Sequence, residues 1–433
     1  MSVTIARRWR RLFLDERPSM GLSLFRITIA LATGLHVIPT FLQLQDNYLS
    51  TAFKTINPSF FPWPVLHLVA GSPDAVVYAF VALFLVSWCA FLVGLWTQIS
   101  ALVLLAACYY FYALNSLHIG TLSWDILLVT LVLMCATPYP GDYFSVDSLR
   151  RGDPQAYRRT RPYFLQRLLQ IQIATVFFFT GLNKIVAGGN WLHANPIAYL
   201  VNGGAWGVVK DFWGRGWLAQ HSDVCYAIGI TVIVCELAMP FLLFARRTRL
   251  LAIGLGCAFH MLLVLTMHVP TLFFFHFPPQ LCLFIDPRTI VAWIDRRRAG
   301  RRRHGVLVFD GHCGFCQASV RRIQTVDLWG YVQPVDYQTR GDVRQLHPSL
   351  DVATCRAQLH LVEPGRVSGG FAVFQRLSLR LPLLWPAAPL LHLPGMVLVG
   401  GAVYRWVAAH RYLFGAGRVC ADQQCAVHPP VNQ

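Results

Sequence analysis

Acidic residues and lysines are scarce in this chain. Among its 433 residues there are only 20 Asp and Glu, and all but three of its 37 basic residues are arginines. Charged residues make up 13% of the chain, about half the share typical of soluble domains, whereas hydrophobic residues make up 55%. This composition excludes a wholly soluble globular protein, and it equally excludes a chain kept disordered by its charge.

Long apolar runs fill the first 294 residues. A membrane-spanning helix needs about 20 consecutive, mostly apolar residues. We predict eight spans, near residues 22–41, 73–95, 99–117, 122–138, 164–187, 224–244, 250–268 and 271–294. The first run is too long for a cleavable signal, so none is expected. The sequence therefore predicts a polytopic α-helical membrane domain over residues 1–294.

The arginines are grouped in alternate loops between these spans. The rich segments are residues 7–11, 150–161, 246–249 and 296–303, whereas the other loops hold only Lys54, Lys210 and Arg215. Because positively charged loops stay on the cytoplasmic side, the N-terminus, the 139–163 loop and everything after residue 295 are expected there. The 42–72 and 188–220 loops are expected outside. This grouping accounts for the net charge of +17 without nucleic-acid binding.

An arginine-rich linker, residues 295–304, leads into a different kind of sequence. Strands are predicted at 306–309, 332–335 and 359–362, and helices at about 315–327, 370–380 and 396–412. Residues 305–433 are thus expected to form an α/β domain with its own core. The apolar stretch 390–407 could touch a membrane surface, but it is predicted to be a buried helix of this domain.

Two cysteines three residues apart lie where the first of these strands turns into a helix. Backbone N–H groups at a helix N-terminus favour negative charge, so Cys313 is predicted to be the attacking thiolate and the more exposed thiol. Cys316, one turn further on, is predicted to resolve the mixed disulfide. In the cytosol the pair would rest as a dithiol and reduce a disulfide of a protein or small molecule, with electrons from a cytosolic reductant.

A zinc site is the main alternative for this pair. Cys420 with Cys425, or His312, could complete a set of ligands with Cys313 and Cys316. The strand-to-helix position is more typical of redox sites, and the remote cysteines are separated by four residues. We therefore predict a redox site without a metal ion.

The sequence around the cysteines resembles a known family. Residues 308–316, Val-Phe-Asp-Gly-His-Cys-Gly-Phe-Cys, are similar to the signature of the DCC family of thiol-disulfide oxidoreductases, and the similarity continues at 369–372 and 404–412. The resemblance implies a thioredoxin-like fold. It also implies that Asp310 joins Cys313 and Cys316 at the catalytic site, where it orients groups or accepts a proton.

Several ionisable residues fall inside the apolar spans: Arg26, His36, Asp125, Lys184, Glu236, His260 and His276. Such groups are costly in a membrane, so they either pair across helices or face a functional cavity. Lys184 stands out because arginine is the usual cation of this chain. A desolvated lysine can lose its proton, whereas an arginine effectively cannot.

The surroundings of Lys184 carry a second resemblance. Thr-Gly-Leu-Asn-Lys-Ile at 180–185, followed by Asn-Trp-Leu at 190–192, is similar to a segment of the vitamin K-dependent γ-carboxylases. Phe259-His260 resembles their histidine-bearing helix. Phe-Arg-Ile at 25–27 and Glu-Leu-Ala-Met-Pro at 236–240 fit the wider group of HTTM (horizontally transferred transmembrane) domains. The chain lacks the large extracytoplasmic domain with which the carboxylases bind their substrates.

This second resemblance covers about residues 18–290. It implies that Lys184 is a base acting on a reduced, vitamin K-like quinone, with His260, Glu236, Arg26 and Asp125 as further candidates for that site.

We thus expect a membrane-anchored thiol-disulfide oxidoreductase whose partners are the lipid bilayer, a thiol or disulfide substrate and a cytosolic reductant. Two alternatives stay open. One is a carboxylase-like or quinone-linked enzyme in the membrane domain. The other is a non-catalytic maturation or transport factor for secreted peptides. The sequence indicates neither the substrate nor the oligomeric state.

Overall fold

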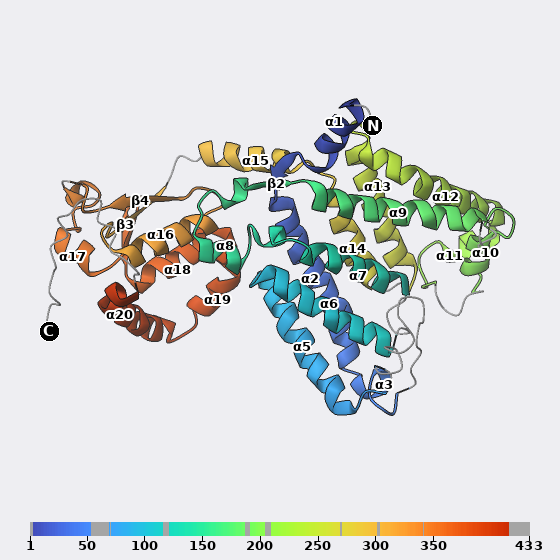
Figure 1. The fold of residues 1–433 in the computed structure, drawn as a ribbon, viewed down its shortest axis with the longest axis horizontal. Coiled ribbons are helices and arrows are strands. Elements are labelled where there is room, and N and C mark those ends of the chain that lie inside the picture. Colours follow the sequence, from blue (N-terminus) through green and yellow to red (C-terminus); the bar gives the residue numbers. More distant parts are fainter. Residues whose placement is uncertain are drawn as a thin grey trace. The chain divides into compact units, whose positions relative to one another are not determined.

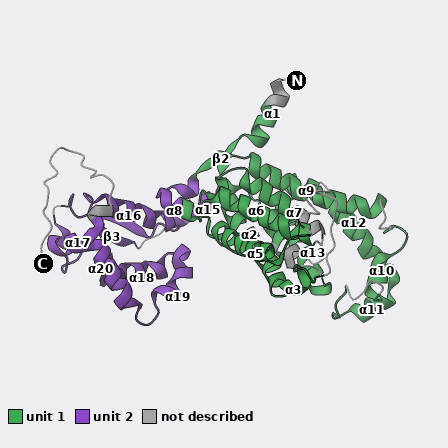
Figure 2. Cartoon of the chain, turned by 60° about the horizontal axis from the view of Figure 1, so that its bottom comes forward, with its two compact units in different colours: residues 1–147, 159–289 green, residues 148–158, 290–433 purple. Residues whose placement is uncertain are grey.

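The chain was analysed as a computed structural model that describes residues 3–52, 69, 71–115, 121–186, 191–203, 209–268, 271–300, 304–340 and 342–414, with the side chains of 3–6, 8, 121–125, 271–275 and 412–414 left undescribed. Its contacts divide it into two compact units (Figure 2). Residues 1–147 and 159–289 form the helical unit. Residues 148–158 and 290–433 form the α/β unit.

Among its described residues, the helical unit contains six helices that are long and apolar enough to cross a bilayer (Figure 1). They are α2 (Met20–Phe41), α5 (Asp74–Val93), α6 (Thr97–Leu114), α9 (Phe164–Val186), α12 (Ser222–Phe244) and α13 (Arg249–Thr266). Two further predicted spans correspond to shorter helices, α7 (Thr121–Cys135) and α14 (Thr271–Cys282). The polytopic helical domain predicted from the sequence is therefore confirmed.

The last predicted span, 271–294, is wrong in its extent. The helix α14 ends at Cys282, and a separate helix, α15 (Pro287–Ala299), begins after a short turn. The Asp286 carboxylate accepts the Arg288 N–H at 3.0 Å. Pro287 suits the first position of the helix because its nitrogen has no hydrogen that would need an acceptor there. Asp286 and Pro287 thus stop the apolar segment and start a new, charged helix.

Small residues allow the helices to approach closely in this unit. Gly181 of α9 faces Glu236 and Leu237 of α12, where a Cβ atom would lie 3.1 Å from the Cβ of Glu236. Packing through small side chains is a common way for membrane helices to associate. A buried apolar cluster continues this contact with Phe177 and Phe277, and it positions α9, α12, α13 and α14 against one another.

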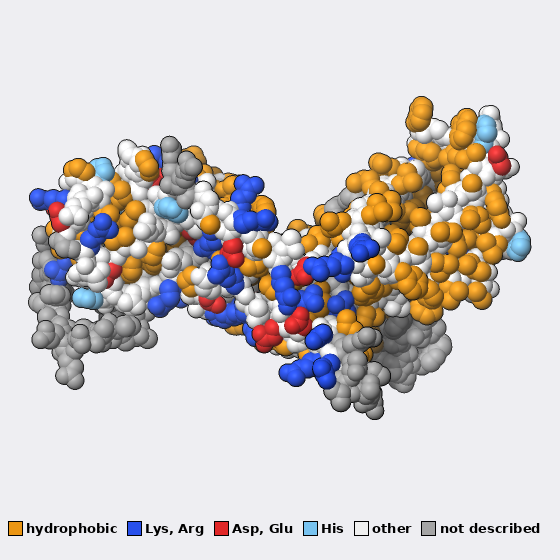
Figure 3. All heavy atoms as spheres, turned by 90° about the horizontal axis from the view of Figure 1, so that it is seen from above, with side chains coloured by type: hydrophobic (Ala, Val, Ile, Leu, Met, Phe, Trp, Pro, Cys, Tyr) orange, Lys and Arg blue, Asp and Glu red, His pale blue; other side chains and the backbone are white. Residues whose placement is uncertain are grey.

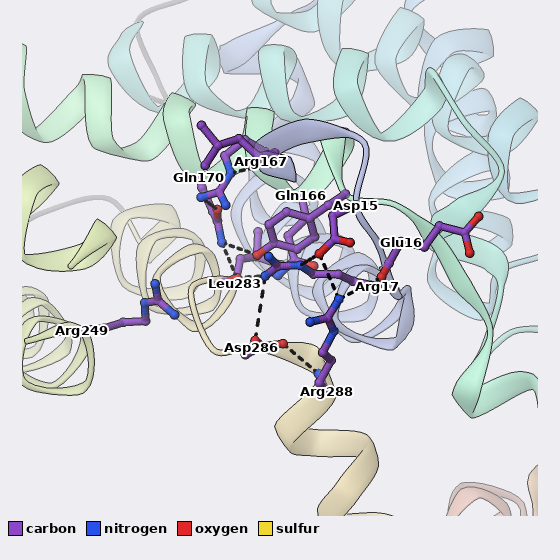
Figure 4. Close-up of polar contacts among 12 residues, drawn as sticks. Asp15, Glu16, Arg17, Gln166, Arg167, Gln170, Arg249, Leu283, Asp286 and Arg288 are labelled. Carbon is purple, nitrogen blue, oxygen red and sulfur yellow. Dashed lines mark hydrogen bonds and ion pairs between the residues drawn. The ribbon is translucent and has the colours of Figure 1, made fainter. Parts of the chain in front are cut away.

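One end of the helical unit is polar, and it collects the segments that the sequence makes rich in arginine. The short strand β1 (Glu16–Pro18) pairs with β2 (Thr160–Pro162). The buried Asp142 binds both Nε and Nη2 of Arg161, at 2.8 and 3.0 Å. Figure 4 shows side chains that precede α2, start α9 and α13, and follow α14 gathered in the same region. In the space-filling view, apolar side chains cover much of the remaining visible surface (Figure 3).

The α/β unit has a four-stranded mixed sheet in the order β4-β3-β5-β6. Its strands are β3 (Gly305–Phe309), β4 (Val332–Asp336), β5 (His360–Glu363) and β6 (Arg366–Gly369). The central β3 is parallel to β4 and antiparallel to β5. Helix α16 (Gly314–Val326) connects β3 to β4, and α18 (Phe371–Arg380) follows β6. This is a thioredoxin-like topology, as the DCC resemblance implies.

Two short elements of this unit were not predicted. They are β6 and α17 (Val352–Ala357), each of which is too short to leave a clear periodicity in the sequence. A loop of the first half of the chain also joins this unit: η3 (Ala156–Arg158) contacts α15. The Tyr157 hydroxyl donates to Asp295 at 2.8 Å, and Arg158 donates to the same carboxylate at 2.7 Å.

The expectation of a buried helix over 390–407 is wrong. In the structure its first residues end α19 (Ala388–Leu391), which follows η5 (Pro382–Ala387), and from residue 396 it belongs to α20 (Met396–Phe414). One face of α20 does pack, since a Cβ atom on Gly400 would overlap the Phe371 ring. The other face carries Leu398 and Trp406, each of which is more than half exposed. Apolar composition correctly predicted a helix, but it did not distinguish a packed face from an exposed one.

Candidate functional site

The loop Asp310-Gly311-His312 joins the central strand β3 to α16. One Asp310 carboxylate oxygen accepts the N–H of His312 at 3.1 Å. The Gly311 N–H donates to Asp336, at the end of the neighbouring strand β4, at 2.9 Å. A Cβ atom on Gly311 would collide with that carboxylate, so only glycine fits at this position. These contacts explain why Asp and Gly precede the cysteines.

Cys313 is the N-cap residue of α16. Its Sγ accepts the N–H of Cys316 at 3.3 Å, in the position where a capping side chain satisfies a free helix N–H. The Cys316 thiol hydrogen bond lowers the pKa of Cys313 to about 7, with help from this backbone N–H and from the Arg411 charge, while burial acts in the opposite direction. Cys313 is therefore largely a thiolate just above neutral pH.

Cys316 has the opposite electrostatic environment. Its hydrogen bond to Cys313 and then burial raise the pKa of Cys316, because the thiol proton is held by the neighbouring sulfur. The expectation that Cys313 is the more exposed thiol is wrong. Cys313 is only 1% exposed, whereas Cys316 is intermediate in burial. The local motif could not predict that α20, which comes much later in the chain, packs near α16.

Asp310 is buried and lies in a polar network beside the cysteines. Its carboxylate accepts the Gln338 side-chain amide at 3.3 Å and Nη2 of Arg411 at 3.4 Å. Arg411 also donates to the carbonyl of Arg356 at 2.9 Å, which fixes the guanidinium between α17 and the site. The predicted site residues Asp310, Cys313 and Cys316 thus lie together at one end of α16.

Two residues of α20 were missed as part of this site. They are Arg411, described above, and Tyr404, whose hydroxyl accepts the Leu359 N–H at 2.9 Å and whose pKa is raised first by burial and then by the nearby Cys316. Tyr404 and Arg411 are seven residues apart, so they share one face of the helix. That spacing of seven residues, which places the two polar side chains on one face of the helix, was the available signal.

The described residues contain no cluster of three or more His, Cys, Asp or Glu side chains arranged to hold a metal ion. The proposed zinc partners Cys420 and Cys425 lie outside the described residues. His312 is exposed beside the dithiol.

In the helical unit the structure brings together Lys184 and Glu236. The Lys184 ammonium lies 2.6 and 2.8 Å from the two carboxylate oxygens of Glu236 and 5.2 Å from the centre of the Trp191 ring. Glu236 is buried between α9 and α12, and Lys184 is partly buried near the end of α9 opposite the polar end. This geometry is that of an interhelical ion pair.

Comparison with known families accounts for both units. Residues 16–288, well over half of the chain, match the family model of the HTTM domain. The chain belongs to the HTTM family. Residues 307–416 of this HTTM protein match the model described as DCC1-like thiol-disulfide oxidoreductase, so the resemblances to the HTTM group and to the DCC family are confirmed. No curated protein matches the chain. No solved structure matches it either.

Among the described residues, no hydrogen bond or ion pair links the other membrane candidates of the HTTM protein to Lys184 or Glu236. The buried His260 lies 2.8 Å from the Gly256 carbonyl through Nδ1 and stacks on Phe277. Arg26 lies toward the polar end, where it donates to the carbonyls of Pro140, at 3.1 Å, and Phe144. The side chain of Asp125 is outside the described residues. Arg26 therefore holds loops together rather than completing a site around Lys184.

Proposed function

We propose that this HTTM protein is a membrane-anchored thiol-disulfide oxidoreductase that reduces a disulfide-containing substrate through Cys313 and Cys316. The observation that carries the proposal is the position of Cys313 as the N-cap of α16. There its sulfur receives the Cys316 N–H and lies in the field of Arg411. The match of residues 307–416 to the DCC1-like oxidoreductases supports the same chemistry.

The reaction begins at Cys313. Its thiolate attacks one sulfur of the substrate disulfide and forms a mixed disulfide, and the other substrate sulfur leaves as a thiolate that takes a proton from water. Cys316 then loses its thiol proton, attacks the Cys313 sulfur and closes the intramolecular disulfide. The second substrate sulfur leaves as a thiolate. Two electrons have passed to the substrate, and a thiol reductant of the cytosol restores the dithiol.

The difference between the two thiols suits this order of events. Cys316 holds its proton while it donates a hydrogen bond to the Cys313 thiolate, which keeps the pKa of Cys316 raised. Once Cys313 is bonded to substrate, that negative partner is gone, so Cys316 becomes easier to ionise. Asp310 is the proposed acceptor of its proton, because this carboxylate is close enough to influence the charge on both sulfurs.

We propose that the polar end of the helical unit faces the cytoplasm, and with it the dithiol. Arginines that precede α2, start α9 and α13, and follow α14 gather at that end (Figure 4), as expected for the side on which positive loops are retained. Three helices long enough to cross a bilayer, α9, α12 and α13, and the shorter helix α14 lie between the 148–158 loop and α15. With α14 as the fourth crossing, an even number returns the chain to the same side. The contacts of Tyr157 and Arg158 with Asp295 agree with that count.

A reaction with a reduced quinone in the helical unit is a second candidate function, and the Lys184–Glu236 pair is the only specific observation that bears on it. A base that activates a hydroquinone must be neutral when it acts. In the described geometry Lys184 is held in an ion pair with the Glu236 carboxylate. The pair therefore does not fit a lysine acting alone as a base, and we derive no step through a quinone.

The experiment that tests the main proposal uses the purified full chain. Reduction of a small aromatic disulfide by the pre-reduced protein is measured as released thiol, and about one equivalent of intramolecular disulfide should form. Cys316→Ser should accumulate a mixed disulfide through Cys313, because nothing remains to resolve it. Cys313→Ser should show neither reaction. Cys355→Ser, a buried thiol elsewhere in the same unit, is the matched control. Full reductase activity in Cys313→Ser would refute the assignment.

A further inference from the structure

The α/β unit has an exposed apolar surface that its own core does not explain. It lies on the bent pair formed by η5 with α19 and by α20. Six of its residues, each more than half exposed, define what we call the hairpin face: Trp385, Leu390, Leu393, Val397, Leu398 and Trp406. Contiguous apolar patches of this kind on a folded unit mark interaction sites. From this face we propose that the α/β unit docks on an anionic lipid bilayer through η5, α19 and α20.

The shape of the pair suits shallow insertion better than crossing. Its two parts together are apolar enough to cross a membrane, but they are bent by 110°. The bend lies at Pro394-Gly395, where Gly395 adopts a positive φ of 80°. Leu393, Val397 and Leu398 flank the bend, and Leu398 is the most exposed of the six at 77%. A helical bend with apolar residues at its tip can enter the boundary between headgroups and acyl chains.

The charged residues around the hairpin face indicate which kind of surface covers it. The 58 residues from 364 to 421 contain no Asp or Glu, but they contain six arginines. Arg376 and Arg380 are paired with Glu363 at the edge of the sheet. Arg405 is exposed on α20 next to Trp406. Arg405 beside this apolar face, within a segment that has no acidic residue of its own, is complementary to a layer of anionic phosphates, and tryptophan side chains are favoured at that boundary.

The connection of the α/β unit to the helical unit keeps the hairpin face near a lipid bilayer. The α/β unit follows α14 through the short helix α15, and α14 belongs to a unit with six helices able to cross a bilayer. A short tether keeps the hairpin face at a high local concentration near a membrane surface, so even weak intrinsic affinity is sufficient for docking.

The same helix connects the face to the dithiol. Gly400, Tyr404 and Arg411 form the packed side of α20, where they contact Phe371, Leu359 and Asp310. The opposite side of α20 carries Leu398 and Trp406. Docking through that opposite side would therefore hold α20, and the Arg411–Asp310 contact with it, at the membrane surface. The proposal itself rests on the surface, and it does not depend on the thiol chemistry.

The test starts from the full chain in vesicles, with a specific protease sequence in place of residues 301–303. After cleavage, the fragment that begins at residue 304 should float with vesicles that contain phosphatidylglycerol. It should be released in larger part from vesicles of phosphatidylcholine alone and at high salt. It should also bind added protein-free phosphatidylglycerol vesicles. Leu398→Asp should lower the bound-to-free ratio about tenfold, because it places a carboxylate in the apolar boundary.

Val352→Asp is the matched control, since Val352 is equally apolar and 60% exposed but lies on α17, outside the hairpin face. It should leave binding unchanged. Trp406→Ser is a second variant with a milder change, and the alkylation rate of Cys313 reports whether each variant is folded.

Release of the parent fragment from phosphatidylglycerol vesicles at low salt would overturn the proposal. So would retention on the original vesicles without binding to protein-free ones, or binding explained by a dimer of the fragment, because either result would mean that a protein covers the face.

Discussion

Arg411 reaches back across 101 positions of sequence to place a guanidinium nitrogen 3.4 Å from the Asp310 carboxylate. Both side chains are buried, and the same nitrogen of Arg411 binds the Arg356 carbonyl. The pair sets a positive charge beside Cys313, which lowers its pKa, and balances it with a carboxylate that acts in the opposite direction. The closing helix of the α/β unit is thus part of the electrostatics of the dithiol.

The rate of Cys313 alkylation should depend on pH with a midpoint near 7. Below that pH the thiol is protonated and slow, and above it the thiolate reacts. Cys316→Ala removes the hydrogen bond that contributes most to this pKa, so the midpoint should move toward the ordinary value of about 8.5. Rates measured from pH 5 to 10 by mass spectrometry on the full chain provide the test.

Arg411→Met should move the same midpoint upward by a smaller amount, since the arginine contributes less than the Cys316 hydrogen bond. Arg405→Met, one of the exposed arginines on the same helix, should leave the midpoint unchanged. If both arginine variants keep the parent midpoint, Arg411 acts only in packing.

Local chemistry made the core of the dithiol site predictable. The run from Val306 to Phe309, the Asp-Gly turn and the Cys-x-x-Cys spacing all lie within a dozen residues, so a strand, a turn and a helix N-terminus could be read in order. Long-range packing was not predictable in the same way. The burial of Cys313 and the contacts of Arg411 and Tyr404 depend on where α20 folds back. An apolar helix pattern is the same whether a core or a bilayer covers it, which is why 390–407 was predicted to be buried.

In the helical unit, too, local sequence patterns were predictive and long-range contacts were not. Hydropathy located six long spans because each has to satisfy the same length requirement. It extended the last span too far because Ile285 and the apolar residues of α15 continue the pattern beyond Asp286. The identity of the partner of Lys184 was also hidden, since Glu236 lies 52 positions away.

Gly311→Ala should destabilise the α/β unit by about 1–3 kcal/mol, because the new methyl group is forced against the Asp336 carboxylate. The displaced loop should also slow alkylation of Cys313 at neutral pH. Removing the obstructing carboxylate in the double variant Gly311→Ala/Asp336→Ala should restore part of the loss. Proteolysis in increasing urea, followed on the full chain, measures the stability. Equal stability of Gly311→Ala and the parent would mean that the loop relaxes freely.

The orientation of the chain can be tested with paired reporters. A reporter that is active only outside the cytoplasm should be silent when fused after Gln433. The same reporter should be active when inserted after Gly203, between α10 (Pro196–Val201) and α12, at the end of the helical unit away from the arginine-rich segments. A cytoplasmic reporter should give the opposite pattern. Activity of the first reporter at residue 433 would place the dithiol in an oxidising compartment.

Lys184 and Glu236 should behave as a coupled pair. Lys184→Ala leaves the buried Glu236 carboxylate without its partner 2.6 Å away, and breaking a buried pair in this way costs about 3–5 kcal/mol. Lys184→Ala/Glu236→Ala removes both charges and should recover most of the folded yield. Lys184→Arg keeps the cation and should fold like the parent. The fraction of protein that elutes as a single folded species in detergent, measured against temperature, reports these differences. Normal folding of Lys184→Arg together with loss of a membrane-domain activity would instead assign Lys184 a role that needs its proton to leave.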